Sequence, residues 1–143
     1  MSENQKKYTL IDGLTLQPHD IGSKRIVRAA WLDDEEVPGA PYFDAVWVVD
    51  DIPEGPEEHS HDFEEYLGFM SGDPSTYDLG CTVEFEVDGD VIRSTKNCIL
   101  YVPAGVKHCP FRVLNVTRPV LMYSGGPNVN YQRKYEDGTY RKN

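Results

Sequence analysis

The sequence is short of basic residues and of long apolar runs, and each shortage excludes a class of function. Its 14 Lys and Arg residues are outnumbered by 24 Asp and Glu residues, which gives a formal net charge of −10. Nucleic acids and anionic membrane surfaces attract proteins through a surplus of Lys and Arg, so we expect neither as a partner. No apolar run approaches the roughly 20 residues that span a bilayer. The N-terminal residues lead into no apolar stretch either, so no signal peptide is expected.

Cysteine is scarce, and its spacing offers no pairing scheme. The three residues, Cys81, Cys98 and Cys109, are odd in number and form no CxxC motif. This usage is typical of reduced thiols, so we expect a cytoplasmic protein. We interpret the thiols as small buried hydrophobic groups rather than as redox groups or ligands.

The pattern along the chain is that of short strands separated by turns. Its 143 residues fit one domain, so we expect a single domain over 1–143. Twelve Gly and ten Pro residues are spread between runs rich in β-branched and aromatic residues, and no window has a helical period. Asp88-Gly89 is a strong signal for a two-residue hairpin turn. The sequence therefore predicts an all-β sandwich or barrel, with strands near 25–32, 43–49, 66–70, 82–87, 90–94, 99–102, 111–116 and 119–123.

The residues His59-Ser60-His61 offer two imidazoles to one point in space. Side chains two positions apart on a strand point to the same side, and neutral imidazole is the commonest protein ligand for transition metals. Glu65 follows and can supply a carboxylate oxygen to the same ion, although Glu64 competes with it because a shift of one residue reverses the face. The fourth histidine of the chain, His19, has no partner by spacing and is interpreted as a loop residue.

A second polar block runs from Pro103 to His108. Pro103 fixes its own φ and Gly105 permits a tight turn, so the two can swing the chain round before His108. Three of the four histidines therefore lie in two short blocks, separated by a stretch of predicted strands.

These two blocks resemble the two motifs of the cupin superfamily. The first motif matches at His59, His61, Glu65 and Gly72 with the superfamily's spacing, which also selects Glu65 over Glu64. The second motif matches at Pro103, Gly105 and His108. The resemblance implies a cupin-type double-stranded β-helix, or jelly-roll barrel, with its core at about 43–124 and extensions at both ends. It also implies that one divalent transition metal is held by His59, His61, Glu65 and His108.

Three positions depart from the superfamily's pattern, namely Pro53, Asn97 and Arg112. Pro53 and Asn97 replace glycines but suit turns themselves. Arg112 replaces an asparagine and is a candidate substrate-binding residue. Arg112 lies four residues after His108, so on a regular strand its side chain points to the same face as that of His108. It therefore faces the barrel interior if the strand stays regular through Pro110, and it faces water if Pro110 interrupts the alternation of side chains. An inward guanidinium with no acidic neighbour would suit an anionic substrate.

A metal held by three imidazoles and one carboxylate carries a net positive charge and attracts anionic oxygen donors. The mixed ligand set suits Fe, Mn, Ni, Co or Zn. We therefore favour an enzyme acting on a small anionic substrate by non-redox chemistry, as an isomerase, lyase or decarboxylase. An iron-dependent dioxygenase and a binding module without catalysis are the alternatives, since the fold hosts all three. We also expect a homodimer, with the strand before Trp31 as the pairing edge.

Overall fold

The computed structural model describes residues 7–12, 24–127 and 130–141. His19 lies outside these ranges. Within them the chain forms only β-strands, as the sequence predicts, and none of the described residues belongs to a helix long and apolar enough to cross a membrane. The strands are β1 (Ile26–Leu32), β2 (Tyr42–Val48), β3 (Glu65–Ser71), β4 (Asp78–Val87), β5 (Asp90–Lys96), β6 (Cys98–Val102), β7 (His108–Leu114), β8 (Val120–Gly126), β9 (Arg133–Lys134) and β10 (Tyr140–Arg141).

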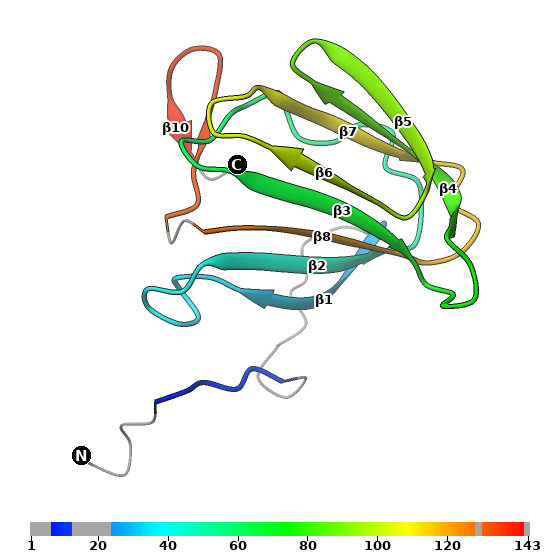
Figure 1. The fold of residues 1–143 in the computed structure, drawn as a ribbon, viewed down its shortest axis with the longest axis horizontal. Coiled ribbons are helices and arrows are strands. Elements are labelled where there is room, and N and C mark those ends of the chain that lie inside the picture. The colour runs from blue at the N-terminus through cyan, green and yellow to red at the C-terminus, as the bar shows by residue number, and fades with distance from the viewer. Residues whose placement is uncertain (1–6, 13–23, 128–129, 142–143) are drawn as a thin grey trace.

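The eight long strands form two antiparallel sheets (Figure 1). The larger has the order β1-β2-β8-β3-β6, and the smaller has the order β5-β4-β7. Strand β8, late in the chain, lies between β2 and β3, so segments far apart in sequence are hydrogen-bonded neighbours. Each of the eight predicted strands overlaps one of β1 to β8, and the all-β prediction is confirmed.

The core lies between the two sheets. Phe69 of β3 is fully buried and contacts Phe85 of β4 and Phe111 of β7, with ring centroids 5.7 and 6.2 Å apart. The predicted alternation in β4 is present, because Val83 and Phe85 are buried while the glutamates between and after them are not. Burial of such side chains contributes about 1.5 to 3 kcal/mol each, which makes this apolar layer the main source of stability.

Turn residues set the local geometry where the sequence predicts them. Asp88 and Gly89 have φ values of 49° and 81°, and they join β4 to β5 at the register pair Val87 and Asp90. Two consecutive residues with positive φ are what a type I′ hairpin turn requires, so the predicted hairpin is confirmed. In the long connection after the first motif, the Asp73 carboxylate accepts a hydrogen bond from the Ser75 amide in an exposed turn.

A short C-terminal hairpin, β9 and β10, returns to one end of the two sheets (Figure 1). Ser60 and Lys134 exchange two backbone hydrogen bonds of 2.8 and 2.7 Å, which fix this hairpin beside the HxH block. The hairpin therefore places residues from the end of the described chain next to the predicted metal ligands.

Candidate metal centre

The two motif blocks are paired through their backbones. His59 and His108 exchange two backbone hydrogen bonds of 3.0 and 2.9 Å, and the Gly105 amide donates to the carbonyl of His61 over 2.8 Å. Gly105 has a φ of 82°, and the turn it makes carries the chain into β7 at His108. This pairing brings His108, the first residue of β7, against His59 and His61, which precede β3.

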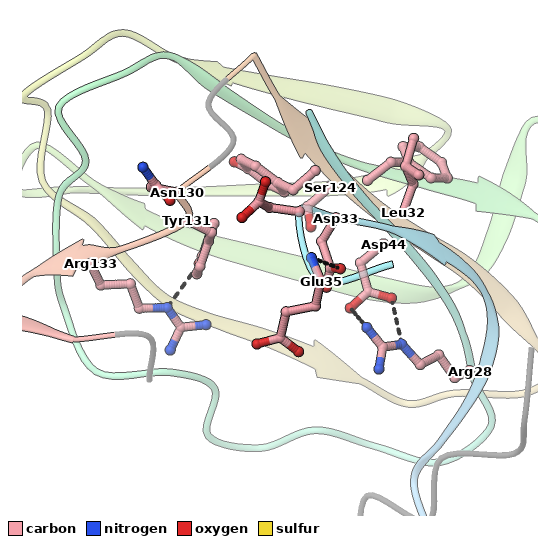
Figure 2. A pocket seen from close by; sticks show the side chains of 12 residues that line it. Arg28, Leu32, Asp33, Glu35, Asp44, Ser124, Asn130, Tyr131 and Arg133 are labelled. Carbon is pink, nitrogen blue, oxygen red and sulfur yellow. Dashed lines mark hydrogen bonds and ion pairs between the residues drawn. The ribbon is translucent and has the colours of Figure 1, made fainter. Parts of the chain in front are cut away.

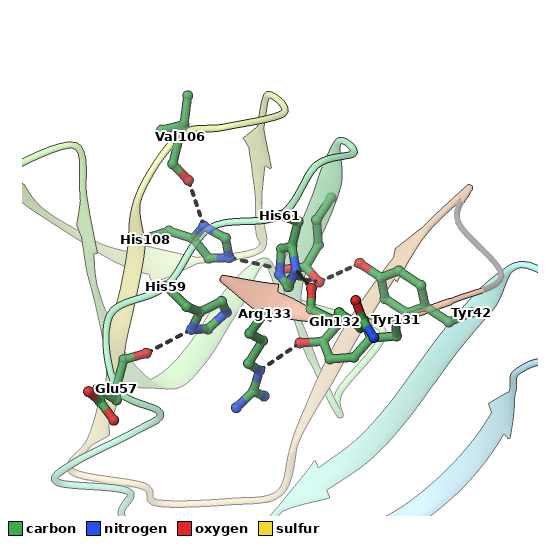
Figure 3. A network of polar contacts seen from close by, with 10 residues as sticks. Tyr42, Glu57, His59, His61, Val106, His108, Tyr131, Gln132 and Arg133 are labelled. Carbon is green, nitrogen blue, oxygen red and sulfur yellow. Dashed lines mark hydrogen bonds and ion pairs between the residues drawn. The ribbon is translucent and has the colours of Figure 1, made fainter. Parts of the chain in front are cut away.

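The four predicted ligands meet in a buried cluster (Figure 3). The ring centroids of His59, His61 and His108 lie 4.5 to 5.0 Å apart. Glu65 opens β3 and is only 7% exposed, whereas Glu64 is exposed, so the carboxylate that faces the histidines is that of Glu65. Its two oxygens lie 3.5 Å from Nε2 of His61 and 3.3 Å from Nε2 of His108.

Backbone carbonyls select the tautomer of each imidazole. Nδ1 of His59 lies 2.7 Å from the carbonyl of Glu57, and Nδ1 of His108 lies 3.0 Å from that of Val106. Nδ1 of His61 bonds the carbonyl of Gln132. A carbonyl oxygen only accepts, so each Nδ1 carries the proton and each neutral ring keeps a lone pair on Nε2. Figure 3 shows these three contacts as dashed lines.

The resulting arrangement fits a divalent metal. The Nε2 atoms of His61 and His108 are buried without a hydrogen-bond partner among the described residues. Both face the Glu65 carboxylate, and lone pairs opposite a carboxylate repel unless a positive charge lies between them. Neutral imidazole nitrogens and an ionised carboxylate are the donors that a divalent transition metal takes.

His59 completes the cluster from the other side. Burial lowers its pKa to about 3, so its ring is neutral at physiological pH and can donate a lone pair. Its ligand atom groups with those of His108 and Cys109, all within 4.8 Å of one another, while those of His61, Glu65 and His108 form a second such group. Burial raises the pKa of the Cys109 thiol to about 12. The closeness of this thiol has no signal in the sequence, because Cys109 follows His108 directly and would face away from it on a regular strand.

Tyr42 is a functional candidate that sequence reasoning misses. Its hydroxyl donates a hydrogen bond to Oε2 of Glu65, across 23 residues of sequence. Burial, followed by the negative charge of Glu65, raises the pKa of Tyr42, so the hydroxyl stays protonated and remains a donor. Tyr131 packs against Tyr42 with ring centroids 4.8 Å apart. These phenols form an aromatic wall on one side of the cluster (Figure 3).

Arg112, the candidate substrate contact, does not join the cluster. Its guanidinium lies 3.0 Å from Glu84 and 2.7 Å from Glu86. Between the register pairs Phe85 with Phe111 and Val87 with His108, β4 advances two residues and β7 advances three. This bulge reverses the alternation in β7, so His108 points inward while Arg112 shares the outer face of β4 with the two glutamates. The condition for a substrate role, an inward guanidinium without acidic neighbours, is not met.

Two cavities meet at Arg133, and neither is lined by any of the four predicted ligands. One, of about 400 Å³, is lined by Tyr42, Tyr131, Arg133 and the acidic segment after β1 (Figure 2). The other, of about 460 Å³, has an apolar wall that includes Leu67 and Met122. The two cavities share Arg133, so this residue lines both of them.

The sequence matches no protein-family model and no curated protein. Solved structures do resemble the fold. KdgF from Halomonas sp. has a TM-score of 0.52 at 13% identity, over 85% of this chain and 94% of that one. Oxalate decarboxylase from Bacillus subtilis has a TM-score of 0.51 at 19% identity, over 82% of this chain and 29% of that one. A further structure of the same decarboxylase, from work on its Mn(II) centres, has a TM-score of 0.50 at 19% identity and covers the same shares.

Proposed function

We propose that this chain, which has the cupin fold, binds one divalent transition metal and acts on a small anionic oxygen-donor substrate by non-redox chemistry. The ligands would be His59, His61, Glu65 and His108. The observation that carries the proposal is the pair of buried Nε2 atoms, of His61 and His108, that have no hydrogen-bond partner among the described residues and lie 3.5 and 3.3 Å from the Glu65 carboxylate. Mn belongs with Fe, Ni, Co and Zn among the candidate metals, and the Mn(II) centres of the similar decarboxylase support its inclusion.

The residues around the centre have separable tasks. A divalent metal bound there would polarise a substrate oxygen and stabilise negative charge that develops on it. The carbonyls of Glu57, Val106 and Gln132 hold the imidazoles in the tautomer that presents Nε2. Tyr42 holds Glu65 by its hydroxyl and keeps the carboxylate turned toward the histidines. The aromatic wall and the burial of the cluster exclude water from this side of the site.

Ligand substitution with elemental analysis tests the metal centre. Protein purified without added metal should retain about one metal ion per chain, and His61→Ala or His108→Ala should lose it. The matched control is Glu64→Gln, because this exposed carboxylate neighbours Glu65 but faces away from the cluster. Equal metal content in the wild type and both histidine variants would reject the centre.

The identity of the metal separates the proposed chemistry from its alternatives. Zinc, manganese or nickel supports non-redox chemistry, whereas iron favours a dioxygenase. A chain that binds a small molecule tightly, retains its metal and never converts that molecule would be a binding module. Mass spectrometry of ligands that remain bound through purification would identify the substrate class directly.

The assembly and location are proposed on simpler grounds. We expect a homodimer that pairs through β1, because β1 is an edge of the larger sheet and Val27 on it is 56% exposed. A cytoplasmic location suits the three free thiols.

A further inference from the structure

Arg133 lies beside the candidate metal centre without a carboxylate to pair with. Four other arginines of the described chain have a carboxylate oxygen within 3.7 Å, namely Arg28, Arg93, Arg112 and Arg141. A fifth, Arg118, bonds the backbone carbonyl of Asp78. No ion pair joins Arg133 to a carboxylate of the described residues. Its Nε donates a hydrogen bond of 2.9 Å to the Tyr131 hydroxyl. The residue before it, Gln132, provides the carbonyl that orients His61, so Arg133 is held close to the ligands (Figure 3).

The partners of Arg133 leave its charge uncompensated. Besides Tyr131, the phenol of Tyr135 lies near its side chain. Burial raises the pKa of Tyr131 to about 12, so this phenol is neutral at physiological pH. A guanidinium has five N–H donors, and two phenol oxygens do not use them all. A partly buried guanidinium with spare donors can take an anion as a further partner.

The surroundings of Arg133 have room for such an anion. Arg133 lines both cavities, of about 400 and 460 Å³, and the larger has an apolar wall that includes Leu67, Phe111 and Met122. Acidic residues also line these cavities: Asp33, Asp34 and Glu35 line the smaller, Glu54 the larger and Asp44 both. The two oxygens of Asp44 accept hydrogen bonds of 3.1 and 3.2 Å from Arg28, so Arg133 is the positive group in the part that the two cavities share. Figure 2 shows that ion pair apart from Arg133. Cavities of a few hundred Å³ hold small molecules.

We propose that Arg133, together with the Tyr131 hydroxyl, binds the carboxylate of a small organic acid in the cavities that meet at Arg133. The inference rests on the proposed function and narrows its substrate to organic acids. A planar guanidinium fork matches the two oxygens of a carboxylate, and charge-assisted bonds of this kind are stronger than bonds between neutral groups. The Tyr131 hydroxyl accepts from Arg133 and has its own proton to donate to the same carboxylate.

Calorimetric titration with malonate and with its neutral analogue malonamide tests the proposal. Metal-loaded wild-type protein should bind malonate at least roughly tenfold more tightly than malonamide, because malonate offers charged oxygens to both Arg133 and the metal. Arg133→Met should weaken malonate binding by roughly tenfold and leave malonamide binding unchanged, while its metal content stays at the wild-type level. The part of the preference that the metal itself supplies should remain. Arg133→Lys, which keeps the charge but loses the fork, should give an intermediate affinity for malonate.

Arg112→Met is the matched control, because Arg112 is paired with Glu84 and Glu86 on the outer face. It should leave malonate binding unchanged. Equal malonate affinity in wild type, Arg133→Met and Arg133→Lys would overturn the inference. If Arg133→Met loses metal, the test is the malonate affinity of Arg133→Lys and of wild type at equal metal content. A lower affinity in Arg133→Lys supports the inference, and an equal affinity overturns it.

Repeating the titration after EDTA treatment separates this inference from the proposed function. Malonate binding that still depends on Arg133 in a protein that never retains metal would support the carboxylate site and reject the metal centre. If malonate affinity is the same with and without Arg133 in a protein with full metal content, the metal centre is supported and the carboxylate site is rejected.

Discussion

Among single residues, Tyr42 makes the contact on which the orientation of Glu65 depends. Its hydroxyl bonds Oε2 of a carboxylate that is only 7% exposed, and neighbours of this kind fix the direction in which a ligand presents its oxygens. Tyr42 lies in β2 and Glu65 in β3, with β8 between them in the sheet. The hydroxyl of Tyr42 on β2 therefore positions the carboxylate of Glu65, the first residue of β3.

We expect Tyr42→Phe to lower metal affinity by about tenfold, the lower end of the effect of removing a neighbour of a metal ligand. The ring and its packing against Tyr131 would stay, so only the hydroxyl is lost. Competition with a chromogenic chelator measures the change. Tyr101→Phe is the control, since Tyr101 is 61% exposed on β6. An unchanged affinity in Tyr42→Phe would show that Glu65 needs no such support.

Asp51 gives a pH-dependent contribution to stability away from the metal centre. Its carboxylate accepts hydrogen bonds from the amides of Asn115 and Val116, at 3.0 and 2.8 Å, and these bonds lower its pKa. A folded-state pKa below the unfolded value means that the stabilisation is present at neutral pH. It is lost as the pH falls below the unfolded value, about 3.9, toward the lower folded one.

Chemical denaturation as a function of pH tests the contribution of Asp51 to stability. Asp51→Asn should be less stable than wild type at pH 7, and the difference should shrink as the pH falls below about 4. Asp90→Asn, in the exposed start of β5, is the control. A difference that stays constant from pH 7 to the acid limit would contradict the assignment.

At the scale of elements, the C-terminal hairpin belongs to the metal centre. Strand β9 pairs with the HxH block through Ser60 and Lys134. The carbonyl of Gln132, the residue just before β9, orients His61. The hairpin also brings Tyr131 and Arg133 into the cavity walls. Its contribution is therefore to the geometry of the ligands as well as to the fold.

Lys134→Pro should lower metal affinity and the free energy of unfolding, because proline removes the amide that donates to the Ser60 carbonyl over 2.7 Å. Loss of one such bond costs about 1 kcal/mol. Lys134→Ala removes the same side chain but keeps the amide, so it should resemble wild type. The two variants are compared by urea denaturation and metal titration. Equal behaviour of the pair would show that β9 is not required.

The same elements show how far the sequence predicts this protein. The HxH spacing, Glu65 and the Pro103–His108 turn are local patterns, and they indicated the four residues that the structure gathers into one cluster. The strand runs and the Asp88-Gly89 turn are local as well, and the fold class followed from them. What stayed hidden depends on tertiary pairing. Nothing near Tyr42 in the sequence indicates its contact with Glu65, and nothing near Arg133 indicates that it lies close to the histidine cluster.

Arg112 shows where a periodic argument leaves two outcomes open. Regular alternation from His108 places residue 112 inward, but one extra residue in the bulge of β7 reverses the faces beyond it. The sequence offers Pro110 as a warning without fixing the outcome. The pairing of Arg112 with two glutamates of β4 is a register effect between strands, which no pattern within β7 contains.

For the whole molecule, metal binding should be visible as thermal stability. A ligand that binds only the folded state adds about 2.7 kcal/mol when its concentration is a hundredfold above Kd. For a chain of this size that corresponds to a rise in Tm of roughly 5 to 10 °C. Differential scanning calorimetry before and after EDTA treatment measures the rise. The His61→Ala variant should show no EDTA effect, and a wild-type Tm indifferent to both chelation and metal would contradict the prediction.

The assembly is also a property of the whole molecule. Sedimentation at micromolar concentration should give a homodimer, and Val27→Glu on β1 should shift it toward monomer by placing like charges at the pairing edge. Ile99→Glu is the matched control, because Ile99 is 64% exposed on β6, at the opposite edge of the same sheet. If only Ile99→Glu dissociates the dimer, pairing runs through β6, and a monomeric wild type would reject the dimer altogether.

The pairing of Ser60 with Lys134 sets an order of events during synthesis. His59, His61 and Glu65 leave the ribosome early and His108 follows, but the carbonyl that orients His61 belongs to Gln132, after all eight strands of the two sheets. A nascent chain that has already formed both sheets still lacks the group that fixes one of its four proposed ligands.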